Sequence, residues 1–236
     1  MSKLTDDVIA LIKQATDGER RLVLRYLQQY IPPHALEVEW NTTAEEILTA
    51  IARSSDLTLR GIRGILAEAT FGRRVIPNLE PHGWQAIKVI GDQSYDFLLA
   101  RDAARVRVQV KLQRKERGTP KEYSGRSRAA FNRPDGKVWV VEVQKTRSGE
   151  KAGVKTRPYR FDDFDILAVS LHPSTGEWEQ LMYTVGNWLL PRASDPDLIE
   201  IFQPVPSAKD EYWTDDLSEC IEWFLRGEQR RLYAQP

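Results

Sequence analysis

Asp96, Gln109 and Lys111 are the residues whose types and spacing indicate chemistry. Asp96 lies in an apolar stretch, where an ionised carboxylate needs partners. Residues 105–113 alternate strictly between apolar and polar side chains, which predicts a strand with Gln109 and Lys111 on one face, about 6–7 Å apart. A carboxylate, an amide oxygen and an ammonium gathered at one end of a sheet suit a hard cation with a positive charge beside it.

Two predicted strands have to bring these residues together. Residues 94–100 form a run that is typical of a strand, and residues 101–104 connect it to the strand at 105–113. Because the connection is short, we expect the two strands to be antiparallel neighbours. That pairing places Asp96 beside Gln109 and Lys111.

With this arrangement the sequence resembles the PD-(D/E)xK nuclease superfamily, in the variant that has Gln-x-Lys instead of Asp/Glu-x-Lys. The resemblance covers residues 57–171 and includes an acidic residue at the end of a helix upstream of the sheet, which several members supply. In the position before the first aspartate, where the superfamily has proline, this chain has Tyr95. The matching residues are Glu68, Asp96 and Gln109-Val110-Lys111.

The resemblance implies a Mg²⁺-dependent endonuclease that cleaves double-stranded DNA, most like a type II restriction endonuclease, with Mn²⁺ as a substitute metal. It implies that the metal is held by Asp96, Gln109, the carbonyl of Val110 and Glu68. Lys111 would orient or acidify the attacking water and stabilise charge on the phosphate. A homodimer would follow from a palindromic target, since two strands need two sites related by a two-fold axis.

A second set of residues competes for the same role. Pro134-Asp135 is followed by Glu142 and Gln144, and Glu-x-Gln variants also occur in the superfamily. Asp135-Gly136 is typical of a turn, so we favour the set that contains Asp96. Two further functions fit the same residues: a transposon-end or repair nuclease of the same superfamily, and a DNA-binding protein without catalysis.

The charge distribution favours a polyanion as partner. The chain has no net charge, but residues 101–160 hold 18 Lys and Arg against 6 Asp and Glu, a net of +12. This basic block predicts a surface that faces nucleic acid, or else a segment folded against the acidic residues 161–236. The residues of the block that we expect to contact DNA are Arg107, Gln113, Arg114, Lys115, Arg126, Arg128, Gln144, Lys145 and Arg147.

Composition excludes several other classes of protein. The chain of 236 residues has no apolar stretch of the length that a membrane helix needs, and its first residues do not resemble a cleavable signal, so we expect a cytoplasmic protein. The single cysteine, Cys220, excludes a disulfide framework, and the three isolated histidines disfavour a histidine metal cluster.

The predicted fold class is α/β, a mixed sheet flanked by helices like the core of restriction endonucleases, with an N-terminal helical subdomain at 1–56. The nuclease domain, 57–236, ends in a helical extension. Thr16 and Thr43 begin capping boxes, and residues 43–53 and 57–70 form a helix pair that could be a helix-turn-helix. The remaining predictions are strands at 84–90, 138–143 and 166–171, partly helical segments at 178–190 and 215–226, and solvated aspartates at 162, 163 and 165.

The basic block generates a first prediction. We expect the affinity for duplex DNA to fall steeply as salt is added, because Arg and Lys of residues 101–160 displace counterions from phosphates. Fluorescence anisotropy of a labelled duplex at a series of salt concentrations measures this slope. A dissociation constant that barely changes between low and physiological salt would show that the block does not face DNA.

Overall fold

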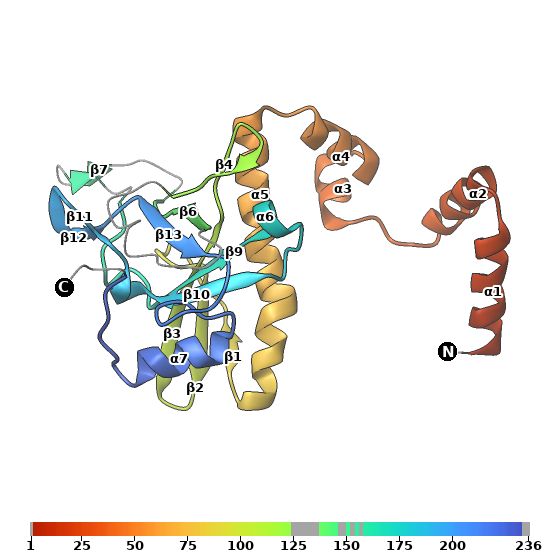
Figure 1. Cartoon of the computed structure of the whole chain (residues 1–236). Coiled ribbons are helices and arrows are strands. Elements are labelled where there is room, and N and C mark those ends of the chain that lie inside the picture. Colours follow the sequence, from red (N-terminus) through yellow and green to blue (C-terminus); the bar gives the residue numbers. More distant parts are fainter. Residues whose placement is uncertain (1, 124–136, 146–149, 152–153, 156–157, 233–236) are drawn as a thin grey trace. The chain divides into compact units, whose positions relative to one another are not determined.

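The computed structural model describes residues 2–123, 137–145, 150–151, 154–155 and 158–232. Its contacts divide the chain into two compact units, residues 1–59 and residues 60–236 (Figure 1). No helix in the described part of the chain is long and apolar enough to cross a membrane.

The first unit is helical, as the sequence predicts. Capping boxes begin α2 and α4, in which Thr16 and Thr43 accept from the backbone N–H groups of Glu19 and Glu46. The six-residue helix α3 was not predicted, since its N-cap is His34. The helices of this unit among the described residues are α1 (Lys3–Gln14), α2 (Asp17–Gln28), α3 (Ala35–Trp40) and α4 (Ala44–Ala52).

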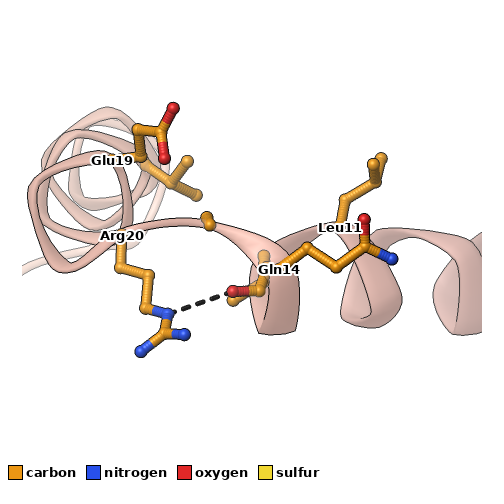
Figure 2. A pocket seen from close by; sticks show the side chains of 7 residues that line it. Leu11, Gln14, Glu19 and Arg20 are labelled. Atoms are coloured by element: carbon orange, nitrogen blue, oxygen red, sulfur yellow. Dashed lines mark hydrogen bonds between the residues drawn. The ribbon is translucent and has the colours of Figure 1, made fainter.

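Arg20 joins α1 to α2. Its guanidinium donates from Nε to the carbonyl of Ile12 at 3.1 Å and from Nη2 to the carbonyl of Lys13 at 3.0 Å. Figure 2 shows this side chain beside a shallow pocket between the two helices, which Leu11 and Val23 also line. The last carbonyls of α1 have no partner within the helix, so Arg20 satisfies acceptors that would otherwise bind only water.

The second unit is built on a mixed sheet flanked by helices, which confirms the predicted α/β class. In the described residues the sheet has five strands in the order β1-β2-β3-β9-β10, with β3 and β9 parallel and the other neighbours antiparallel. Figure 1 shows the long helix α5 and the shorter helix α7 beside this sheet. The elements are β1 (Gln85–Ile87), β2 (Phe97–Arg101), β3 (Ala104–Leu112), β9 (Ile166–Ser170), β10 (Leu181–Val185), α5 (Asp56–Thr70) and α7 (Leu217–Leu225).

Smaller elements surround the main sheet. Helix α5 continues into the π-helical η1 and the 3-10 helix η2, and Phe71 of η1 packs its ring against Phe97 of β2 at 5.0 Å between centroids. Strand β6 pairs with β13, and three further pairs of short strands lie around it. These elements are η1 (Phe71–Val75), η2 (Ile76–His82), β4 (Lys115–Glu116), β5 (Thr119–Pro120), β6 (Val138–Glu142), β7 (Glu150–Lys151), β8 (Val154–Lys155), α6 (His172–Thr175), η4 (Gly186–Trp188), β11 (Pro191–Arg192), β12 (Asp195–Ile199) and β13 (Phe202–Pro206).

Strands β2 and β3 are antiparallel neighbours in a hairpin, as predicted. Arg101 pairs with Ala104 across a two-residue turn, in which Asp102 takes the left-handed conformation that aspartate tolerates. Val106, Val108 and Val110 are fully buried, because β3 lies in the middle of the sheet. The predicted strand is therefore confirmed, but its burial does not alternate throughout, because Gln109 on the opposite face is buried as well.

Two segments differ from the prediction. Residues 178–190, predicted to be partly helical, contain the strand β10 and only the three-residue 3-10 helix η4. All five residues of β10 are buried, so no alternation marks the strand in the sequence. The strand predicted at 84–90 is confined to Gln85–Ile87. The helix predicted at 215–226 is confirmed as α7.

Gly186 allows close packing beneath the sheet. A Cβ atom at this position would lie 2.7 Å from the carbonyl oxygen of Phe164 and 3.2 Å from its ring. Phe164 in turn packs edge-on against the ring of Tyr159, with 5.3 Å between centroids. Because Gly186 has no side chain, Phe164 can pack directly against its backbone.

We predict that Gly186→Ala lowers the free energy of unfolding by about 1–3 kcal/mol, because the backbone of Phe164 has to move. Gly64→Ala is the matched control: Gly64 lies in α5 with open space around the new methyl group, so the substitution should stabilise by about 0.5–1 kcal/mol. Urea denaturation of both variants measures the difference. Equal changes in both would contradict the packing argument.

Candidate active site

The start of β2 and the end of β3 bring Asp96, Gln109 and Lys111 together. The backbone N–H of Asp96 donates to the carbonyl of Val108 at 3.0 Å. Val108 is already the partner of Phe97 in the ladder, so the chain departs from the β2–β3 register at Asp96. Its carboxylate oxygen Oδ2 accepts from the backbone N–H of Val110 at 2.8 Å and from the Gln109 amide at 2.5 Å. The sequence predicted this convergence from strand period and turn length alone.

Tyr159 completes the group, and the sequence did not predict it. Its hydroxyl donates to Oε1 of Gln109 at 3.1 Å and accepts from Nζ of Lys111 at 3.4 Å. Tyr159 is 4% exposed and Gln109 is 2% exposed, so these contacts are closed to water. Nothing in the spacing of Tyr159 marks it, because it lies outside the strands that carry the other residues.

Burial shifts the pKa values of the ionisable groups in this site. It lowers the pKa of the Lys111 ammonium, against the attraction of Asp96 and Glu68. It raises the pKa of Asp96, against the charge of Lys111 and the Val110 N–H. Burial, and to a smaller extent the charge of Asp96, raises the pKa of Glu68, on α5, to about 7. Glu68 therefore lies close enough to the strand residues to interact electrostatically with them.

Two carboxylates and two neutral oxygen atoms make up the possible ligands at this site, a set that a hard divalent cation accepts. In the part of the chain that the structure describes, no group of three His, Cys, Asp or Glu could hold a metal. Glu68 and Asp96 are two carboxylates, and the charge of Asp96 raises the pKa of Glu68, a cost that a cation would relieve. The amide of Gln109 and the carbonyl of Val110 are neutral oxygen donors of the kind that Mg²⁺ accepts. In this structure the Gln109 NH₂ group faces Asp96 and the Val110 carbonyl.

The competing set has a different environment. Asp135 lies outside the described residues. Glu142, at the end of β6, forms an ion pair with Arg114 and accepts from the amide of Gln144. Its carboxylate is therefore occupied by a cation and an amide of its own neighbours.

The residues expected to contact DNA divide into three groups. Arg126, Arg128 and Arg147 lie outside the described residues. Lys115 is exposed, Lys145 is partly exposed and pairs with Asp163 at 3.3 Å, and Gln144 and Arg114 are half-buried beside Glu142. Gln113 is 2% exposed and accepts from the backbone N–H of Ser174 at 3.1 Å, so its side chain does not reach the surface.

Arg107 is held by an acidic partner. Its guanidinium donates to both carboxylate oxygens of Asp165, at 2.7 and 3.1 Å, and to the carbonyl of Asp162 at 2.6 Å. Asp165 and Asp163 were expected to be solvated, but they pair with Arg107 and Lys145. Part of the basic block is thus neutralised by the acidic residues 161–236, the second of the two arrangements that the charge distribution predicts.

Comparison with known proteins adds little. No protein-family model and no curated protein matches the chain. Among solved structures, the chain is similar to the bacterial homing endonuclease I-Ssp6803I, with 18% identity and a TM-score of 0.39 over 73% of this chain and 96% of that chain. A likeness of this size carries no argument about this chain, so its function has to be inferred from the site.

The raised pKa of Glu68 predicts a pH dependence of stability. Folded protein binds a proton at Glu68 more tightly than the unfolded chain, whose glutamates titrate near 4.5, so the free energy of unfolding falls as the pH rises from there to about 7. Glu68→Gln removes this loss. The free energy of unfolding of the variant, relative to that of wild type, should therefore rise by about 1–2 kcal/mol between pH 4.5 and pH 8. This energy allows for screening of the partly exposed group by solvent.

Urea denaturation in a chelator at both pH values measures this gain. Glu80→Gln is the matched control, because Glu80 is an exposed glutamate outside the site. If the difference in free energy of unfolding between Glu68→Gln and wild type were the same at both pH values, the raised pKa of Glu68 would be contradicted.

Proposed function

We propose that this chain is a Mg²⁺-dependent endonuclease that hydrolyses phosphodiester bonds of double-stranded DNA. The observation that carries the proposal is the partly buried group in which the Asp96 carboxylate, the Gln109 amide and the Lys111 ammonium meet, with Glu68 near enough to interact with their charges. Burying these groups costs stability, since each ionised side chain loses its hydration. Such a cost is typical of a site that is retained for chemistry.

Each residue has a role that follows from its chemistry. Asp96, Glu68, the Gln109 amide oxygen and the Val110 carbonyl would hold the cation, with Mn²⁺ able to replace Mg²⁺. A bound cation of this kind supplies a water of lowered pKa and neutralises charge that develops on the phosphate. Lys111 would stabilise the charge on the phosphate oxygens and orient the attacking water.

Lys145 is suited to bind the phosphate of the substrate. Its Nζ lies 5.2 Å from the centroid of the Tyr159 ring, and Nζ of Lys111 lies 5.3 Å from the same centroid. Two ammonium groups beside one buried ring create a positive field at the site, although Asp163 offsets part of it. The narrower proposal is a homodimeric type II restriction endonuclease, because cleavage of both strands needs two such sites.

We predict that Lys111→Ala and Asp96→Ala each reduce plasmid cleavage in Mg²⁺ by at least about 10²–10³-fold, because each removes a group that acts at the scissile phosphate. DNA binding should stay near normal, and Asp96→Ala tightens it where no metal is present, since it removes a negative charge. Lys88→Ala is the matched control, because Lys88 is an exposed lysine outside both the site and the basic block. Wild-type protein should not cleave in EDTA.

Three results would contradict the proposal in different ways. Cleavage in a chelator would exclude the metal. DNA binding by wild type without cleavage in Mg²⁺ or Mn²⁺ would favour a non-catalytic DNA-binding protein. Loss of cleavage in Glu142→Gln together with normal cleavage in Lys111→Ala would move the site to Asp135, Glu142 and Gln144.

A further inference from the structure

Tyr159 is fixed in place by contacts that do not involve the other site residues. Its backbone carbonyl accepts from the N–H of Ile199, in β12, at 2.9 Å. Its ring meets that of Phe164 edge-on, with an interplanar angle of 86°. The hydroxyl is therefore presented to the site by a rigid support.

The hydroxyl lies between two residues of the site. It donates to the carbonyl oxygen of Gln109 and accepts from the ammonium of Lys111. Burial, together with the negative charge of Asp96, raises the pKa of Tyr159, so the hydroxyl keeps its proton. A protonated hydroxyl can donate one hydrogen bond and accept others.

The orientation of the Gln109 amide decides what Asp96 can bind. Its NH₂ group now donates to Asp96, and its carbonyl faces Tyr159. To share a cation with Asp96, Gln109 has to present its carbonyl there, which turns the NH₂ group towards Tyr159. A tyrosine hydroxyl can satisfy either end of the amide, whereas phenylalanine can satisfy neither.

We propose that Tyr159 is a positioning residue of the nuclease site, which supports both orientations of the Gln109 amide and holds Lys111 beside it. This inference rests on the proposed function. It assigns Tyr159 a role through Gln109 and Lys111 and not through contact with the substrate.

Tyr159→Phe tests the role with little change in packing, because only the hydroxyl is lost. Mn²⁺ binding to metal-free protein, measured by calorimetry, should weaken by about 5–10-fold, since a buried NH₂ group left without an acceptor is tolerated less well than a carbonyl left without a donor. For cleavage, kcat should fall by about 10–100-fold because Lys111 loses its partner, while KM for DNA stays unchanged. Tyr183→Phe, which removes a buried hydroxyl from β10, should change neither quantity.

A double-mutant cycle with Gln109→Ala shows whether the hydroxyl acts through the amide. Tyr159→Phe should weaken Mn²⁺ binding little further once Gln109 is Ala. Wild-type Mn²⁺ affinity in Tyr159→Phe, or additive losses in the double variant, would overturn the inference. These outcomes are distinct from failure of the proposed function, in which wild type does not cleave at all, because Mn²⁺ binding is measured without DNA.

Discussion

The partly buried carboxylate of Asp96 is the constraint on which the rest of the site depends. A carboxylate at the start of a central hairpin has to be satisfied by donors, and here the Val110 N–H and the Gln109 amide supply them. The bond from Val110 takes the place of a further backbone pair, so the side chain of Asp96 ends the β2–β3 ladder. The same carboxylate also accepts from the amide of Gln109, whose carbonyl accepts from the Tyr159 hydroxyl, and this hydroxyl accepts from Lys111.

This arrangement leaves an unbalanced charge inside the protein. Two partly buried carboxylates, Asp96 and Glu68, interact with the ammonium of Lys111, while the ammonium of Lys145 pairs with Asp163. The imbalance is relieved either by a proton on Glu68, which is why burial and the charge of Asp96 raise its pKa to about 7, or by a cation. A site that favours a proton or a cation at neutral pH lowers the stability of the fold, which agrees with the metal-binding role proposed for it.

Part of the basic block contributes to folding. Three of its side chains, Arg101, Arg107 and Lys145, pair with carboxylates from residues 161–236. The contact between Arg107 and Asp165 also joins β3 to the residue just before β9, the strand that lies parallel to β3. A net charge of +12 in the sequence of this block therefore overstates the positive charge that is free to face a polyanion, because some of it is neutralised within the fold.

The sequence by itself determined the features that depend on neighbouring residues. The alternation at 105–113 and the short turn before it predicted β3, the hairpin and the meeting of Asp96 with Gln109 and Lys111, because strand period and turn length are local. Only the tertiary structure decided the features that depend on distant residues. Tyr159 reaches Gln109 across 50 positions of the chain, β10 is buried on both faces and shows no alternation, and the partner of Arg107 lies 58 positions away. Contacts of this kind arise from the packing of the crossover between parallel β3 and β9, which no local pattern of residue types encodes.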